Sequence, residues 1–284
     1  METSLNTKAI RKKRICQIIL YAILSIFAVI CLYPVFFTFN SSLKNNTDIF
    51  ATPFSLPSTP QWENYVRAWT IGKMGVYFKN SIVLTTATLF VSALIGALAS
   101  YILAKFKFKG KGFVYLLFIA GMMVPIQTVI IPLAVTFGKL GIVDNFPVLV
   151  LLYSAFCLSM TVFIVTGYMK GLPDELEEAA VMDGADPVII FFRIILPLSM
   201  PSLVSASIFN FVSAWNNLLF PLVFISKDNM KTISIGLLSF FGAYTSDYGA
   251  VMAAIGVSII PPIIMYILLQ EKMEKGLTAG AVKG

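Results

Sequence analysis

The sequence contains no histidine, and only 12% of its 284 residues are charged. Soluble domains have about 25% charged residues, so 58% hydrophobic residues and a mean hydropathy of +0.85 predict a membrane protein. The lack of histidine excludes a His-dependent serine or cysteine mechanism, and no pair of aspartates lies in the apolar stretches. We therefore expect no catalytic residue, and an intramembrane enzyme is disfavoured.

Cysteine is scarce, and a nucleotide-binding motif is missing. Cys16, Cys31 and Cys157 all lie at or within apolar stretches, whereas a disulfide scaffold or a zinc site needs pairs at short spacing. The sequence therefore predicts no metal and no cofactor. No G-x-x-x-x-G-K-[ST] loop occurs, so any ATP that drives this protein must bind to another chain.

Long apolar runs, in contrast, fill most of the chain. A helix needs about 20 apolar residues to cross a hydrocarbon core of about 30 Å. Six stretches free of Asp, Glu, Lys and Arg are long enough: Ile15–Phe37, Ile82–Ala104, Phe113–Phe137, Val148–Tyr168, Leu203–Ile225 and Gly249–Leu269. We predict an all-α membrane protein with six transmembrane helices, which the prolines at 34, 125, 132, 221, 261 and 262 can kink.

The 21 Lys and Arg residues are unevenly distributed between the two sides of these spans. With a cytoplasmic N-terminus, about two thirds of them lie in inner segments, which is the positive-inside bias. We therefore predict a cytoplasmic N-terminal segment 1–14, a membrane domain 15–270 and a cytoplasmic tail 271–284, of which the last residues, 276–284, are small and flexible. The net charge of +7 then reflects topology rather than a nucleic-acid partner. The first apolar run lacks a cleavage site, so we expect an uncleaved span.

Two segments outside the spans are predicted to form surface helices. In the outer loop 38–81, Trp62, Tyr65 and Trp69 recur at spacings of three and four. This pattern predicts a helix at the membrane interface or against an external partner. The apolar run Thr232–Phe241 is too short to cross the bilayer, and we expect it to form an outer helix.

The most charged interior segment, 171–197, lies between two uncharged spans. Pro173 suits a first helical position, and the acidic residues at 174, 175, 177 and 178 would be stabilised by the helix dipole. Gly184 can end this helix with a positive φ, and Asp186-Pro187 can begin the next one. Leu196-Pro197 then turns into the fifth span. The predicted shape is a helix, a glycine bend and a second helix.

This segment resembles the EAA signature of ABC importer permeases. Glu178-Ala179-Ala180 is followed after three residues by Gly184 and after nine more by Ile194, with Leu196-Pro197 next, which matches the spacing without a gap. Residues similar to the carbohydrate branch, the permeases of maltose and multiple-sugar importers, are Asp183-Gly184-Ala185, Phe191, Arg193, Asn64-Tyr65, Pro125, Pro132, Trp215-Asn216 and Pro221. Gln270 and the closing GLTAGAVKG resemble the smaller six-span subunit of that branch. The sequence departs from the pattern at Asn217, where relatives often carry Glu, and at Asp186 and Pro187.

The resemblance implies a type I ABC importer permease fold in the plasma membrane of a bacterium or archaeon, with 171–197 as the cytoplasmic coupling loop. Its helix would insert into a groove on a cytoplasmic ATPase. Glu178 would make polar contacts, Ala179 and Ala180 would allow close approach, and Gly184, between Asp183 and Ala185, would make the bend. The resemblance also implies a heterodimer with a second permease, two ATPase subunits and an extracytoplasmic solute-binding protein.

Uncharged polar and aromatic residues in the spans are candidates for a translocation path. Because these spans hold no acidic residue or histidine to relay ions, a secondary transporter is disfavoured and a neutral solute is favoured. The candidate path comprises Gln127, Tyr153, Asn210, Ser213, Trp215 and Asn217, with further polar groups at Thr128, Ser154, Ser159, Thr161, Ser205, Ser207 and Asn216. By their spacing, Asn210, Ser213 and Asn217 share one helical face.

Two alternatives stay open for these residues. They could join neighbouring helices, because buried amide and hydroxyl contacts between spans each contribute about 0.6 kcal/mol, and in the resembling family the larger partner permease often supplies most solute contacts. The solute could also be another polar molecule, such as a glycerol-phosphate ester. An anionic ester favours Arg or Lys within the membrane, and these spans contain neither.

Overall fold

The computed structural model describes residues 2–243 and 247–281, with side chains described for 13–238 and 247–270. Every regular element among these residues is helical, in agreement with the predicted all-α class. The chain divides into two compact units. The first contains the residues up to Ile71 together with Phe240–Val257, and the second contains Gly72–Ser239 together with the residues from Ser258 onward.

The helices follow one another along both units. The first unit holds α1 (Glu2–Ser42), α2 (Asn46–Ala51) and α3 (Glu63–Thr70). The second unit holds α4 (Met74–Lys105), α5 (Lys111–Gly121), α6 (Ile126–Leu140), α7 (Phe146–Met169), α8 (Glu175–Met182), α9 (Pro187–Ile190), the π-helix η1 (Phe191–Ile195), α10 (Leu196–Leu198), α11 (Met200–Trp215), α12 (Leu219–Phe224) and the 3₁₀-helix η2 (Asp228–Met230). The helices α13 (Ile233–Ala243) and α14 (Tyr248–Ala281) each have residues in both units.

Four described helices are long and apolar enough to cross a membrane, and two bent helix pairs raise the number of spans to as many as six. The predicted third span is not one straight helix, because α5 and α6 meet at 92°. Pro125 is the N-cap of α6 at this break and cannot continue the preceding helix. The predicted fifth span also stops early, since α11 ends at Trp215 and α12 begins only at Leu219.

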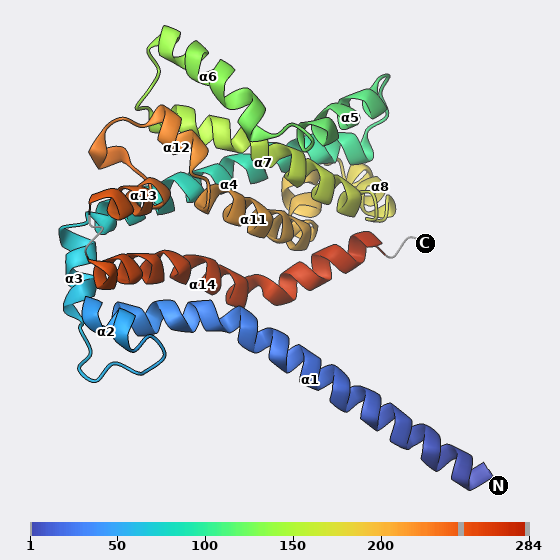
Figure 1. Cartoon of the computed structure of the whole chain (residues 1–284). Helices are drawn as coiled ribbons and strands as arrows, with labels where there is room; N and C mark the ends of the chain where they lie inside the picture. The colour runs from blue at the N-terminus through green and yellow to red at the C-terminus, as the bar shows by residue number, and fades with distance from the viewer. Residues whose placement is uncertain (1, 244–246, 282–284) are drawn as a thin grey trace. The chain divides into compact units, whose positions relative to one another are not determined.

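The centre of the second unit is the packing of α4 against α7 and α11, which run side by side in Figure 1. A stripe of small residues on α4, Thr85, Thr88, Ser92, Gly96 and Ser100, is buried. Small residues let helix backbones approach closely, which in lipid is a main source of helix association. At Gly96 the approach is so close that an added Cβ would lie 2.4 Å from Thr161 Cγ2 on α7.

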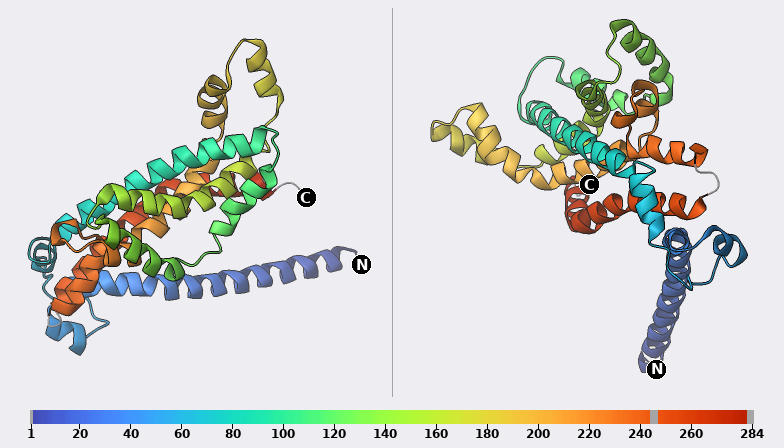
Figure 2. Two further views of the ribbon diagram at one scale, coloured as in Figure 1. Left: turned by 90° about the horizontal axis from the view of Figure 1, so that it is seen from above. Right: turned by 90° about the vertical axis from the view of Figure 1, so that its left-hand side faces the viewer.

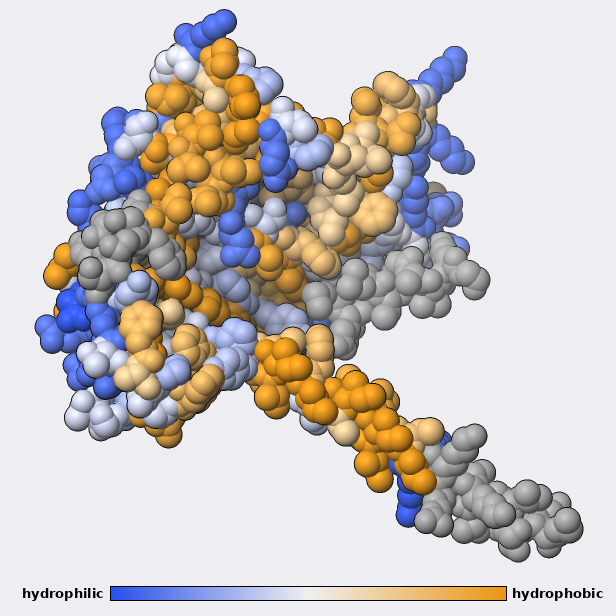
Figure 3. Space-filling view, in the orientation of Figure 1, coloured by the Kyte–Doolittle hydropathy of each residue, from blue (hydrophilic) through white to orange (hydrophobic). Residues whose placement is uncertain are grey.

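The first unit combines an apolar helix with a folded loop. The most apolar window of α1 has none of its residues buried in this chain, and Figure 3 shows hydrophobic residues along that helix. In the segment that follows α1, the side-chain amide of Asn64 donates to the carbonyls of Ser42 (2.8 Å) and Lys44 (2.9 Å). The ammonium of Lys44, only 1% exposed, donates to the Thr52 carbonyl at 2.8 Å. The predicted outer loop is therefore an ordered structure, and the predicted helix near Trp62–Trp69 is confirmed as α3.

Two aspartates organise the end of the second unit at which α4 begins. Asp144, with a left-handed φ of 53°, accepts the backbone N–H groups of Ser226 (2.6 Å) and Lys227 (3.0 Å). Both hydrogen bonds lower the pKa of Asp144, and the one from Lys227 has the larger effect. Asp228 pairs with Lys73 at 2.6 Å, just before α4. The loops before α4, before α7 and after α12 therefore meet at this end of the second unit.

The last helix extends further than the sequence indicates. We predicted that residues 276–284 are flexible, but α14 continues as a helix to Ala281. The side chains from residue 271 onward and all of 282–284 lie outside the described residues, as do the side chains of the N-terminal basic cluster at 8, 11 and 12. The helix expected at Thr232–Phe241 is present as α13.

Candidate functional site

The segment after α7 folds into the predicted helix, bend and helix, and Figure 2 shows α8 and the following helical turns projecting from the α4–α7 bundle. The first helix begins two residues later than predicted, with Asp174 rather than Pro173 next to its start. Glu175, Glu177 and Glu178 lie in its first turn, where the helix dipole favours negative charge.

Gly184 ends α8 in a Schellman motif. Its φ is +81°, its N–H donates to the Val181 carbonyl (3.0 Å), and the N–H of Ala185 donates to the Ala180 carbonyl (3.0 Å). These two bonds satisfy carbonyls that would otherwise lack partners at a helix end, and glycine adopts the left-handed φ at no steric cost. The predicted role of Gly184 as the bend is confirmed by this geometry.

The second helix starts as predicted and bends later than predicted. Asp186 is the N-cap of α9 and accepts the N–H of Ile189 at 2.8 Å, and Pro187 occupies the first helical position. The π-helix η1 follows, in place of an ordinary α-helix. The turn into α11 lies at Ser199 rather than at Pro197, and the helical segments on either side meet at 70°.

Two opposite faces of α8 have different environments. Glu178, Ala179 and Asp183 are exposed, and Met182 is 87% exposed. Ala180 is only 7% exposed and belongs to a core cluster of its own unit. We expected both alanines to allow the approach of a partner, but the structure turns Ala180 inward, so that its small side chain permits close packing within this chain.

The start of α8 is held to the end of α4 by the N-cap residue Asp174. Asp174 Oδ1 lies 2.6 Å from the ammonium of Lys105, the last residue of α4. The hydrogen bond and the positive charge of Lys105 lower the pKa of Asp174. Ala185, on the far side of the bend, packs against the same apolar cluster as Ala180. These contacts fix α8 to the second unit, while its other face stays exposed.

Three of the candidate path residues meet in one cavity of about 140 Å³. Tyr153, Ser213 and Asn217 line it together with Gly121 and Phe220. The Tyr153 hydroxyl is buried and has no hydrogen-bond partner among the described residues, while its ring lies 5.3 Å from that of Phe220 between centroids. An unpaired hydroxyl in such a position can donate to a hydroxyl of an incoming solute.

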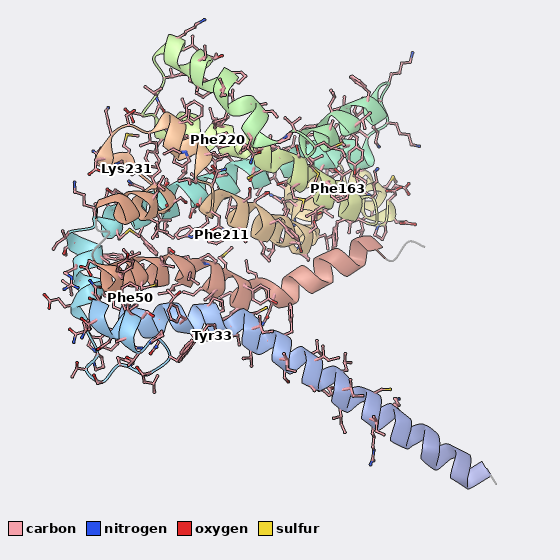
Figure 4. All side chains as sticks on the ribbon, viewed as in Figure 1. Tyr33, Phe50, Phe163, Phe211, Phe220 and Lys231 are labelled. Atoms are coloured by element: carbon pink, nitrogen blue, oxygen red, sulfur yellow. The ribbon has the colours of Figure 1, made fainter. Side chains whose placement is uncertain are left out.

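Trp215 lines a second cavity, of about 440 Å³, with Asn216, Ser234 and Ser258 among its neighbours. The indole N–H donates to the Ser258 carbonyl at 3.1 Å. The ring stacks on Phe211 at 5.7 Å, which Figure 4 labels on α11. Trp215 is thus 3% exposed and already hydrogen-bonded, so its main role in this arrangement is to form the wall of the cavity.

The remaining candidates lie elsewhere. Gln127 is exposed in the first turn of α6, and Asn210 is buried and donates to the Thr161 hydroxyl at 2.8 Å. The predicted common face of Asn210, Ser213 and Asn217 is wrong, because α11 ends at Trp215. Asn217 lies in the link to α12, where its side-chain oxygen accepts the N–H of Phe220 (3.1 Å).

Sequence reasoning missed Lys105 and Tyr101 as partners of the projecting segment. Lys105 is one of the Lys and Arg residues that the sequence analysis uses only to orient the spans. The acidic residues of α8 are explained there by the helix dipole alone. The sequence does contain a signal: Tyr101 and Lys105 are four positions apart, which places both on one helical face at the end of a span.

The fold and this segment define a polytopic helical membrane protein with a projecting helix–glycine–helix element between two of its spans. Residues 92–279 match the family described as binding-protein-dependent transport system inner membrane component. The match covers more than half of the chain and includes the whole projecting element, so the chain belongs to this family of ABC transporter permeases.

Several relatives are similar over nearly their whole length. A probable ABC transporter permease, YurM of Bacillus subtilis, is 36% identical over 274 residues, covering 96% of this chain and 91% of the relative. The diacetylchitobiose uptake permease NgcG of Streptomyces coelicolor is 33% identical, with 93% and 88% covered. The multiple sugar-binding transport permease MsmG of Streptococcus mutans is 34% identical, with 93% and 96% covered.

A solved structure has the same fold. A chain of a bacterial ABC transporter involved in the import of the acidic polysaccharide alginate superposes with a TM-score of 0.79. The superposition covers 92% of this chain and 97% of that chain, at 24% identity. The predicted importer permease fold is confirmed.

Proposed function

We propose that this chain forms half of the translocation pathway of an ATP-driven importer for a sugar or oligosaccharide. An external solute-binding protein delivers the solute, a second permease completes the pathway, and two cytoplasmic ATPase subunits supply the work. The proposal depends on the exposed face of α8. The opposite side of this helix packs against its own unit, and Gly184 follows the end of the helix with a positive φ.

The exposed face of α8 has the chemistry of a docking surface. Met182 presents a flexible apolar side chain that can fill an irregular groove, and Glu178 and Asp183 place carboxylates on the same exposed surface. Carboxylates at the edge of such a contact pair with arginine or lysine of a partner and fix its register. The partner we infer is an ATPase with an apolar groove rimmed by basic residues.

The proposed orientation places α8 and both termini in the cytoplasm. It rests on the positive-inside bias of Lys and Arg. The ion pair between Lys105 and Asp174 supports it, because it joins the basic loop after α4 to the start of α8 at one end of the second unit. The Asp144 and Asp228 contacts gather the loops that we assign to the outside at the other end.

A neutral solute fits the two cavities better than a charged one. Every lining residue that the structure describes for them is uncharged, and both contain hydroxyl or amide groups beside aromatic rings. Hydroxyl and amide groups hydrogen-bond sugar hydroxyls, and aromatic rings pack on the apolar face of a sugar ring. The names of NgcG and MsmG, which are sugar permeases, point to the same class of solute.

Substitution of Gly184 tests the docking role. The left-handed φ makes Gly184→Val strained by about 1–2 kcal/mol, although a Cβ at this position would have nothing within 4 Å in this chain. We expect the variant to be expressed and to lose solute-stimulated ATP hydrolysis in the reconstituted complex. Gly138→Val is the matched control, because Gly138 has equally open space and an ordinary φ. Normal coupled turnover in Gly184→Val would remove the docking role.

The solute is tested with the complete complex in proteoliposomes. ATP hydrolysis is measured with the binding protein loaded in turn with maltose, diacetylchitobiose and an arabino-oligosaccharide. We expect at least one sugar to stimulate hydrolysis and glycerol 3-phosphate to have no effect. Uphill uptake in liposomes that contain the permeases without the ATPase subunits would refute the proposed function.

A further inference from the structure

Lys105 is buried at the place where the last residue of α4 meets the start of α8. Its side chain is only 6% exposed, although it carries a charge. The ammonium donates to the Leu172 carbonyl at 2.8 Å and to Asp174 Oδ1 at 2.6 Å, and lies 3.3 Å from Glu177 Oε1. A buried ammonium needs such partners, because its desolvation is otherwise not compensated.

Tyr101 extends this contact by one helical turn. Its hydroxyl donates to Glu177 Oε2 at 3.2 Å, so the two oxygens of one carboxylate are engaged by two residues of α4. The Tyr101 ring, 5% exposed, lies 5.3 Å from the ring of Phe191 in η1 and 5.3 Å from that of Phe106. The element on both sides of the Gly184 bend is thereby fastened to the end of one helix.

These contacts leave the docking face of α8 free. Glu177 is 19% exposed, whereas Met182 is 87% exposed. A force applied to the outer face of α8 must reach the spans through packed side chains or hydrogen bonds. The charged contacts to Lys105 lead directly into α4, which packs against α7 and α11.

We propose that Lys105, with Tyr101, forms a rigid link that makes α8 and α4 move as one body, so that Lys105 is a positioning residue of the transport cycle. This inference rests on the proposed function, because it needs an ATPase that moves α8. A link that fails would still allow the ATPase to dock and hydrolyse ATP. The work would then no longer reach the spans, and less solute would move for each ATP hydrolysed.

The test compares Lys105→Met with Lys109→Met in the complete complex in proteoliposomes. Methionine is unbranched like lysine, is one atom shorter and removes the charge, and Lys109 is an exposed lysine of the short loop that follows α4. We measure ATPase subunits co-purified, ATP hydrolysed, and labelled maltose or diacetylchitobiose taken up. For Lys105→Met we expect normal co-purification and about a tenfold lower uptake per ATP, a typical size for coupling between sites. Lys109→Met and Lys105→Arg should behave as wild type.

A second variant covers the case in which Lys105→Met does not assemble. Tyr101→Phe removes only a hydroxyl and keeps the ring between Phe106 and Phe191. We expect it to assemble and to lower uptake per ATP by a smaller factor. Equal uptake per ATP in wild type and in each assembled variant would overturn the link alone. A wild-type complex that hydrolyses ATP without taking up any sugar in the panel would instead refute the proposed function.

Discussion

The side-chain nitrogen of Asn210 on α11 lies 2.8 Å from the hydroxyl oxygen of Thr161 on α7, and both residues are buried. This hydrogen bond joins two helices that pack against each other. Asn210, a candidate for solute contact because of its amide, therefore takes part in helix packing. Thr161 in turn donates to the Cys157 carbonyl at 3.0 Å.

Substitution of Asn210 should therefore affect stability more than solute affinity. We expect Asn210→Ala to destabilise the fold, and a double-mutant cycle with Thr161→Val to give a coupling of about 0.6 kcal/mol, as for other interhelical hydrogen bonds in membranes. The cycle is measured by thermal unfolding in detergent. A changed order of preference among sugars, with unchanged stability, would return Asn210 to the translocation path.

The two alanines of the α8 signature should give different results when enlarged. Ala180→Leu inserts volume into a packed cluster and should destabilise the chain by about 1–3 kcal/mol. Ala179→Leu lies on the exposed face and should leave the melting temperature unchanged while weakening co-purification of the ATPase. If both variants lose only stability, α8 has no docking face.

The contact between α4 and α7 should be intolerant of a single methyl group. Gly96→Ala places a Cβ 2.4 Å from Thr161 Cγ2, so that one helix must shift. We expect a loss of about 1–3 kcal/mol in unfolding free energy. Gly112→Ala is the control, because a Cβ there has open space. Equal melting temperatures for the two variants would contradict the close packing.

Asp228 should make the end of the second unit at which α4 begins sensitive to acid. Hydrogen bonds from Lys73, Lys231 and Tyr77 lower the pKa of Asp228 to about 2, from 3.8. Because the pKa of Asp228 is lower in the folded state than in the unfolded state, the ionised carboxylate stabilises the fold. This contribution is complete at a pH above the unfolded-state pKa and is lost as the pH falls from about 4 to about 2. We expect Asp228→Asn to lower the melting temperature at pH 7 and to reduce its fall between pH 5 and pH 2. An equal fall in the melting temperature of the wild type and of Asp228→Asn over this range would contradict the stabilising role of Asp228.

Local chemistry explains which features of the fold could be predicted from the sequence. The bend at Gly184 and the cap at Asp186 depend on residues within a few positions of one another, so a short stretch of sequence determines them. The EAA-like signature has the same local character, since it runs from Glu178 to Pro197.

The features that were mispredicted depend on contacts between distant parts of the chain. An apolar run predicts burial in lipid or protein, but it does not distinguish a straight span from the 92° break before Pro125 or from the end of α11 at Trp215. The tie between Lys105 and Asp174 joins residues 69 positions apart, and only tertiary structure places them together.

The first helix allows a conclusion about the order of assembly. The segment Lys13–Ser42 satisfies its own backbone hydrogen bonds, and the most apolar window of α1 buries no residue against the rest of the chain. A bilayer is therefore a sufficient solvent for it, so α1 can insert as an independent first stage, before the later helices have been synthesised. The close contact of α4 with α7 belongs to a later stage, because it forms only when both helices are present.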